Sequence, residues 1–147
     1  MKNNWSNSEA KKYINAYKKV GHSKDMALRV YTTRLLGRNS KLVLHGGGNT
    51  SVKTKIKDLD GKNYEVLCVK GSGWDMAEIE PEGLPAVKLQ PLLALKNKKN
   101  LSDEDMVAYQ KRNLLDIKSP NPSVETFLHA FLPFKFVDHT HSDAIMN

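Results

Sequence analysis

Two histidines separated by one residue, His139 and His141, end a segment, KFVDHTH, that is typical of a β-strand. On a strand, residues i and i+2 point to the same face, so both imidazoles can bind one metal ion at Zn–N distances of about 2.0–2.1 Å. Glu125 lies near the start of the preceding segment, VETFLHAFL, which we interpret as a helix. A carboxylate there can complete a ligand set or act as a general base. Histidines on strands also hydrogen-bond ordinary neighbours, so a structural role stays open.

His129 follows Glu125 by four residues and therefore shares its helix face. It can orient a residue of a metal site or belong to the core, and the sequence slightly favours the core. His22 and His45 have no comparable partner in the sequence.

Three consecutive glycines, Gly46 to Gly48, stand between two expected strands in the segment HGGGNTS. Glycine allows backbone conformations closed to other residues and a close approach of ligands to the amides, which suits phosphate binding. The motif matches neither the Walker nor the dinucleotide-binding spacing, so a plain turn remains an alternative. A second small-residue turn, VKGSGWD, follows the next strand. We predict that phosphate-like anions bind between Gly48-Asn49 and Ser72-Gly73.

These residues need a sheet and its covering helices to bring them together. Ser23 can cap a helix whose apolar stripe belongs to the core and which Gly37 ends. Residues 41–46 are expected to form a short strand. Residues 51–57 and 64–71 are expected to form two more, joined by the turn DLDGKN, which gives an antiparallel meander.

The second half of the chain alternates helices and a strand. The apolar stretch 84–95 is broken by two prolines, and its type stays open. Ser102 resembles the start of a capping box and predicts a helix that continues to about residue 114. Residues 124–132 predict another helix, and residues 135–141 a strand.

The composition indicates one water-soluble globular domain. The chain has 147 residues and a mass of 16.6 kDa, enough for a real core. It contains no apolar run long enough to cross a bilayer and no apolar leader, so we expect no membrane association. Cys68 is the only cysteine, which excludes an internal disulfide and favours a cytoplasmic location.

The net charge of +7 raises the question of a nucleic-acid partner. The excess is N-terminal: residues 1–60 hold 13 basic against 4 acidic residues, and residues 61–147 hold 10 against 12. The lysines alternate with apolar residues as on solvated faces, and no RNA-binding aromatic motif or zinc-finger spacing accompanies them. We therefore expect no nucleic-acid binding and a small anionic substrate at most.

Three segments in this order, HGGGNTSVK, VKGSGWDMAEIEPEGLPAVKLQPL and SPNPSVETFLHAFLPFKFVDHTHSDAIMN, resemble the class II aldolase/adducin family. Among its branches the chain most resembles the aldolase half of bifunctional rhamnulose-1-phosphate aldolase/lactaldehyde dehydrogenase proteins, in which a short-chain dehydrogenase is fused to the aldolase. The resemblance implies an α/β (α+β-like) fold with a central, mainly antiparallel sheet flanked by helices.

The resemblance also implies roles for individual residues. The substrate phosphate would be held by Gly48, Asn49, Ser72, Gly73 and Ser123. Many relatives have two serines where this sequence has Ser123 and Val124. Glu125 would be the catalytic acid–base residue, and His139 and His141 would be ligands of Zn²⁺.

In the family a third zinc-binding histidine and a proton-donating tyrosine lie far downstream, and this chain does not contain them. A helix is expected to begin near Ser142. We expect residues 1–147 to be an incomplete N-terminal portion of an aldolase domain, without the dehydrogenase half and inactive by itself.

The function implied for the complete enzyme is zinc-dependent retro-aldol cleavage of rhamnulose 1-phosphate to dihydroxyacetone phosphate and lactaldehyde, a step of rhamnose metabolism. Two alternatives stay open. One is a sugar-phosphate 4-epimerase of the same family, and the other is a non-catalytic, adducin-like binding module. The expected partners are a small phosphorylated sugar and further copies of the chain, because the family is commonly tetrameric.

Overall fold

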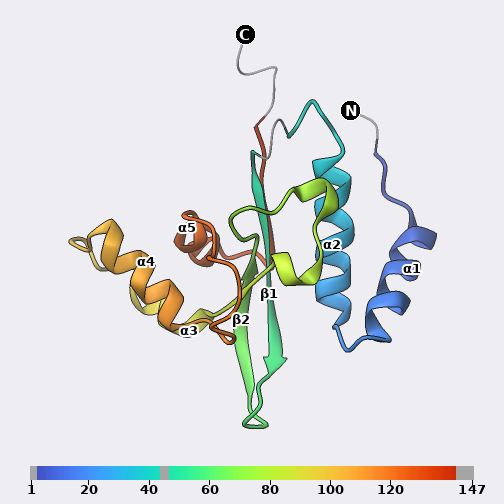
Figure 1. The fold of residues 1–147 in the computed structure, drawn as a ribbon. Helices are drawn as coiled ribbons and strands as arrows, with labels where there is room; N and C mark the ends of the chain where they lie inside the picture. The colour runs from blue at the N-terminus through green and yellow to red at the C-terminus, as the bar shows by residue number, and fades with distance from the viewer. Residues whose placement is uncertain (1–2, 44–46, 142–147) are drawn as a thin grey trace.

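A four-stranded sheet in the order β3-β2-β1-β4 forms the centre of the protein (Figure 1). The computed structural model describes residues 3–43 and 47–141. Every pair of neighbouring strands is antiparallel. The strands are β1 (Asn49–Lys57), β2 (Asn63–Val69), β3 (Ala86–Lys88) and β4 (Phe136–His139).

Helices cover both faces of this sheet. On one side lie α1 (Asn7–Lys18) and α2 (Lys24–Gly37), with the short 3₁₀ helices η1 (Met76–Glu78) and η2 (Pro81–Gly83) (Figure 1). On the other side lie α3 (Leu89–Ala94), α4 (Asp103–Arg112) and α5 (Thr126–Phe131). Within the described residues, no helix is both long and apolar enough to cross a membrane.

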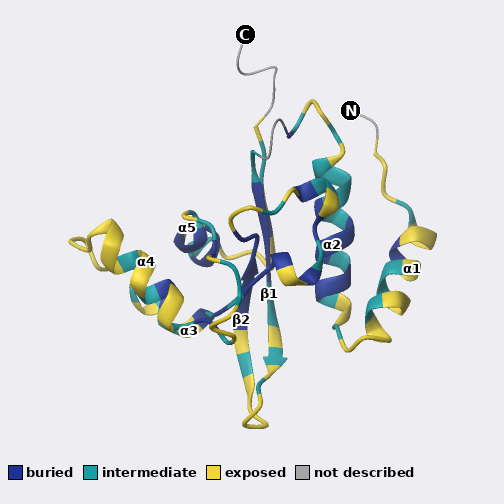
Figure 2. Ribbon diagram, viewed as in Figure 1, coloured by how far each residue is buried: buried dark blue, intermediate teal, exposed yellow. Residues whose placement is uncertain are grey.

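The two-residue period of β1 and β2 divides the core into two clusters. Val52, Val66 and Cys68 pack with Met26 and Val30 on the α2 face. On the opposite face, Leu67 and Val69 pack against α3 and α5. Figure 2 shows that the buried part of β1 and β2 lies between the helices, whereas the hairpin that joins the strands is exposed. Each face of the sheet therefore has its own helical cover.

Most of the expected elements are present, and the α/β fold class with its antiparallel sheet is confirmed. The predicted caps form: the Ser23 side chain accepts a hydrogen bond from the Met26 amide, and Ser102 accepts one from Asp105. The apolar stretch whose type was open divides into β3 and α3. The helix expected near Ser142 falls outside the described residues.

The strand expected at residues 41–46 is wrong for the part that is described. Residues 41–43 belong to a turn, in which the amides of Leu42 and Val43 bond to the carbonyl of Asn39. Residues 44–46 lie outside the described part. The neighbour of β1 on this side is β4, which comes from the other end of the chain. The short apolar run was therefore misread, because a local pattern does not identify a pairing partner.

Helix α1 was not anticipated because its sequence, NSEAKKYINAYK, is mostly polar and buries only Ala10. A signal was present. Ser6 precedes Glu9 by three residues, and the Ser6 side chain accepts a hydrogen bond from the Glu9 amide.

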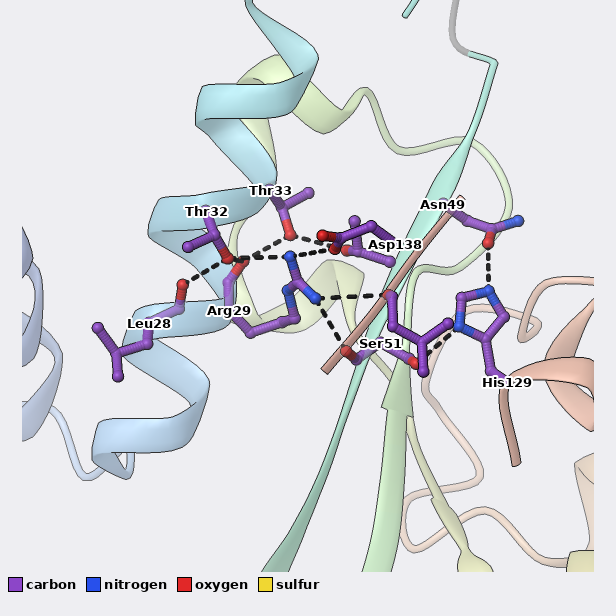
Figure 3. Close-up of polar contacts among 10 residues, drawn as sticks. Leu28, Arg29, Thr32, Thr33, Asn49, Ser51, His129 and Asp138 are labelled. Carbon is purple, nitrogen blue, oxygen red and sulfur yellow. Dashed lines mark hydrogen bonds and ion pairs between the residues drawn. The ribbon is translucent and has the colours of Figure 1, made fainter. Parts of the chain in front are cut away.

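Arg29 joins α2 to β1 and to the edge strand β4 from inside the protein. Its side chain is 1% exposed and its guanidinium forms an ion pair of 2.6 Å with Asp138. It also donates to the carbonyls of Ser51 in β1 and Val137 in β4, at 3.0 and 3.4 Å (Figure 3). Burial lowers the pKa of Arg29, and Asp138 partly offsets this. One side chain therefore fixes the position of β4 relative to both β1 and α2.

We expect Arg29→Met to destabilise the fold by about 2–4 kcal/mol, because it leaves Asp138 and two strand carbonyls without their cationic partner. Lys12→Met is the matched control, since Lys12 also pairs with a carboxylate, Glu9, but on the surface. That change should cost no more than about 0.5 kcal/mol. Urea unfolding of both variants tests this, and equal losses would contradict the role given to Arg29.

Candidate active site

The two small-residue turns singled out in the sequence meet at one end of the sheet. They line a pocket of about 160 Å³ together with the segment that precedes α5. The Ser72 amide donates to the Asn121 carbonyl at 3.0 Å, and the Ser123 amide donates to the Lys70 carbonyl at 3.2 Å. The residues that line this pocket, which we call the end pocket, are Gly48, Asn49, Lys70, Gly71, Ser72, Ser123 and Val124.

Gly48 is required at the start of β1 for two reasons. Its φ of +86° lies in the left-handed region that side chains disfavour. A Cβ atom on Gly48 would also lie 2.6 Å from the carbonyl oxygen of His139 in β4. The glycine therefore lets the backbone of β4 approach the turn.

Asn49 connects the end pocket to the predicted catalytic residues. Its side-chain nitrogen donates to Ser123 Oγ at 3.1 Å and to Glu125 Oε2 at 3.2 Å. The same carboxylate oxygen bonds to Nδ1 of His139 at 2.5 Å. Glu125 lies at the N-terminal cap of α5, and His139 lies opposite Asn49 in the β1–β4 ladder. One amide therefore holds a pocket serine and the Glu125–His139 pair together.

His129 contacts Asn49 from the buried side of the site. It is fully buried, and its two ring nitrogens contact Asn49 Oδ1 and Ser51 Oγ (Figure 3). Because an amide oxygen only accepts, Nε2 must carry the proton and Ser51 must donate to Nδ1. Burial lowers the pKa of His129 from 6.5 to about 4, so the ring is neutral at pH 7. Both alternatives raised by the sequence hold: His129 belongs to the core and also positions a site residue.

Two opposing effects act on the pKa of the Glu125 carboxyl. Desolvation raises the pKa of its carboxyl, but the hydrogen bonds from Asn49 and His139 outweigh this and bring the pKa below its ordinary value. The carboxylate is therefore ionised at neutral pH.

His139 and His141 lie on the same side of the chain, as their spacing predicted, with ring centroids 4.8 Å apart. The strand itself ends at His139, and His141 is exposed. Since Nδ1 of His139 is bonded to Glu125, its Nε2 is the nitrogen left for a metal ion, an arrangement common among metal-binding histidines. Within residues 3–43 and 47–141 there is no group of three or more His, Cys, Asp or Glu side chains that could hold a metal. The two imidazoles fit part of a zinc site.

Residues 27–146 match the family model of the class II aldolase and adducin N-terminal domain. The chain belongs to this family. Its structure is similar to that of the N-terminal class II aldolase domain of a conserved protein from Thermoplasma acidophilum, with 41% identity and a TM-score of 0.84. That similarity covers 99% of this chain and 62% of the other.

A curated relative is much longer than this chain. The uncharacterized oxidoreductase YuxG of Bacillus subtilis (strain 168) is 46% identical over 118 residues, which is 80% of this chain and 17% of the relative. The chain therefore spans less than two thirds of the length of each of these two proteins.

The class II aldolase fold brings together most of the residues that the sequence indicated. Gly48, Asn49, Ser72 and Ser123 line the end pocket, and Asn49 bonds to Glu125, which holds His139. Gly73, also predicted to bind phosphate, does not line the pocket. His45 and Gly46 lie outside the described residues.

Two residues of the site were missed. Ser51 was read only as part of a half-buried strand, yet its hydroxyl bonds to His129. Lys70 was read as the end of a strand, yet it is buried and lines the pocket. The available signal was position, because both residues immediately adjoin the glycine-containing turns.

We expect Gly48→Ala to destabilise the protein more than Gly61→Ala, the matched control. Gly61 has a similar φ of +81°, but nothing lies within 4 Å of a Cβ placed on it. Both changes place a Cβ atom on a residue with left-handed backbone angles, which costs about 1–2 kcal/mol of stability. Only Gly48→Ala adds a clash with β4, which should cost at least about 1 kcal/mol more. Thermal and urea unfolding measure the difference. Equal losses of stability in the two variants would contradict the close approach of the β4 backbone to Gly48.

We expect His129 to make stability depend on pH. Its folded pKa of about 4 lies below the ordinary 6.5, so between these values only the unfolded state takes up the proton. The contribution of His129 to the free energy of unfolding is therefore fully present above about pH 6.5. It falls by roughly 3 kcal/mol as the pH drops to 4. In His129→Gln this contribution is absent. The stability gap between wild type and variant should thus shrink by about 2 kcal/mol between pH 7.5 and pH 5.

Urea unfolding at both pH values tests this dependence. His22→Gln, which replaces a histidine beside Tyr17 on the other side of the sheet, is the control. A gap that stays constant for His129→Gln, or that shrinks equally for His22→Gln, would contradict the assignment.

Proposed function

We propose that this chain is the N-terminal portion of an aldolase domain that cleaves rhamnulose 1-phosphate, a ketose 1-phosphate, to dihydroxyacetone phosphate and lactaldehyde. The observation that carries the proposal is the pair of hydrogen bonds donated by the Asn49 side chain, one of 3.1 Å to Ser123 in the end pocket and one of 3.2 Å to Glu125. A pocket for the phosphate end of a substrate and a carboxylate for its reacting end are thus held at a fixed spacing. Such positioning accounts for a large part of catalysis in bond cleavage.

In the proposed reaction, the bond between carbons 3 and 4 of the sugar breaks and its electron pair stays on carbon 3. The hydroxyl of carbon 4 loses its proton and becomes the aldehyde, while carbon 3 gains a proton. Glu125 holds the proton exchanged at carbon 3, and its bond to His139 keeps the carboxylate in place. Ser72 and Ser123 orient the phosphate from the end pocket.

His139 and His141 would hold Zn²⁺ through their imidazoles, and the rest of the ligand set would come from outside the described residues. Class II aldolases are generally metal-dependent, typically on zinc, and act on small sugar phosphates. When bound, the ion supplies a Lewis acid that polarises the carbonyl oxygen of the substrate.

The length and name of one relative bear on the branch within the family. The relative YuxG carries the name of an oxidoreductase, and the matched region is 17% of its length. A long relative that carries the name of an oxidoreductase supports an aldolase domain joined to a dehydrogenase, which would oxidise or reduce the aldehyde product.

The test is to measure cleavage of rhamnulose 1-phosphate, and zinc per chain, for residues 1–147 and for the protein extended by its downstream coding sequence. We expect the extended protein to bind one zinc per chain and to cleave the substrate, and residues 1–147 to do neither well, because the two imidazoles that the described residues bring together are too few for a catalytic zinc site. Comparable cleavage by both proteins would refute the incomplete-site interpretation. Interconversion of epimers without cleavage would indicate the 4-epimerase.

Glu125→Gln in the extended protein should lower kcat by at least about 100-fold, because the amide cannot take up the proton. Glu104→Gln, at an exposed position on α4, is the matched control and should leave kcat unchanged. A Glu125→Gln enzyme with normal kcat would remove Glu125 from the proposed mechanism.

A further inference from the structure

Lys53 forms an unusual number of hydrogen bonds to one segment of the chain. Its amine donates to three backbone carbonyls, those of His129, Leu132 and Phe134, at 2.9, 2.8 and 2.6 Å. Its backbone amide donates a fourth bond, of 2.8 Å, to the carbonyl of Lys135. An ammonium group has three N–H donors and no acceptor, so the side chain is fully used. All four bonds reach the end of α5 and the turn that leads into β4.

These carbonyls need a donor from outside the helix, because the last carbonyls of a helix have no intrahelical partner. In a longer helix the His129 carbonyl would accept from the amide four residues later, but that residue is Pro133, which has no N–H. Leu132, at the C-terminal cap, and Phe134 lie beyond the last turn of α5. The Lys53 ammonium therefore replaces donors that the backbone does not supply.

Lys53 shares one face of β1 with the polar residues of the candidate site. Asn49, Ser51 and Lys53 occupy alternate positions of the strand, so their side chains point toward α5. Asn49 bonds to Glu125 at the N-terminal cap of α5, and Ser51 bonds to the ring of His129 within the helix. Lys53 holds the opposite end of the helix. Three side chains of β1 therefore fix α5 along its length.

The segment that Lys53 holds joins the two residues of the candidate acid–base and metal site. Glu125 lies at the start of α5, and His139 ends β4, which follows the turn. Arg29 fixes β4 from the opposite face of the sheet. Apolar packing of Phe127 keeps α5 on the sheet, but hydrophobic contacts are non-directional and do not fix the position of the helix along it. The hydrogen bonds from Lys53 supply that position.

We propose that Lys53 is a positioning residue: its ammonium group fixes the end of α5 and the following turn, and thereby the contact between Glu125 and His139. The consequence for catalysis rests on the proposed function, in which Glu125 moves a proton and His139 binds zinc. The consequence for the contact does not, because the hydrogen bonds are present in this chain by itself. The contact and the activity can therefore be measured separately.

The activity experiment compares variants of the extended protein. Lys53→Met removes the donors at similar length, Lys53→Arg restores a charged group with several N–H donors, and Lys55→Met, at the exposed next position on this face of β1, is the matched control. We expect Lys53→Met to lower kcat for rhamnulose 1-phosphate by about 10- to 100-fold and to change KM less than about threefold, because misplaced reacting groups lose rate rather than substrate binding. Lys53→Arg should recover part of this loss, and Lys55→Met should show none of it.

The contact is measured by NMR on residues 1–147 with ¹⁵N-labelled histidine at a fixed pH of about 7.5, where the carboxylate of Glu125 is ionised. The Nδ1 signal of His139 reports its bond to Glu125. We expect this signal to move in Lys53→Met toward its position in Glu125→Ala, which lacks the bond, and to stay unchanged in Lys55→Met. An identical signal in wild type and Lys53→Met would overturn the proposal, even if the variant is less stable.

The outcomes separate the role of Lys53 from the proposed function. If the His139 signal moves but the extended wild type does not cleave the substrate, the proposed function fails and the positioning role stands. If the extended wild type cleaves the substrate and Lys53→Met has the same kcat, the proposed function stands and the positioning role is refuted.

A measurement on unaltered protein covers the case in which Lys53→Met does not fold. In ¹⁵N-labelled wild type, the ammonium hydrogens of Lys53 should exchange with water more slowly than those of Lys55, because three carbonyls hold them. Equal exchange rates for the two lysines would overturn the proposal.

Discussion

The position of β4 depends on the ion pair between Arg29 and Asp138. In the described sheet β4 is an edge strand that pairs only with β1, so its ladder alone gives it few contacts. Arg29 adds a charged bond from α2 to Asp138 and hydrogen bonds to carbonyls of both strands. A buried arginine is costly to desolvate, and its attachment here is compensated by several acceptors at once.

This attachment also fixes which residues of β4 face the site. Asp138 lies opposite Thr50, and His139 lies opposite Asn49. A slip by one residue would turn His139 toward α2 and Asp138 toward α5, because successive side chains of a strand alternate. The contact between Arg29 and Asp138 on one face therefore determines the contact between Glu125 and His139 on the other.

The two faces of β1 serve different purposes. On the α2 face, Val52 joins an apolar cluster, and Thr50 bonds to Thr33. On the α5 face, Asn49 and Ser51 form a polar chain that passes through His129. Polar groups this deeply buried are tolerated only when their partners are supplied, and here each donor meets an acceptor. These hydrogen bonds consequently hold Asn49, and through it Glu125, in a fixed position relative to the core.

Local patterns in the sequence determined much of this protein. The hairpin of β1 and β2, the caps at Ser23 and Ser102, and the shared side of His139 and His141 all follow from periodicity or from contacts within a few residues. Together with the glycine-containing turns, they indicated the antiparallel meander, a possible anion site between the two turns and Glu125, whereas the fold as a whole and the role of Ser123 came from the family resemblance.

Only the tertiary structure decided how distant segments meet. The pairing of β4 with β1, the bond from His129 to Asn49 and the burial of Lys70 join residues that no local pattern relates. The same limit explains the misread strand at residues 41–43, where the chain forms a turn although the run is apolar, and its one contact to the end of β4, from the His141 amide to the Leu42 carbonyl, does not extend into a ladder within the described residues. Strand pairing and pocket formation depend on the packing of segments far apart in the chain, whereas the periodicity of a sequence records only which face of each element is apolar.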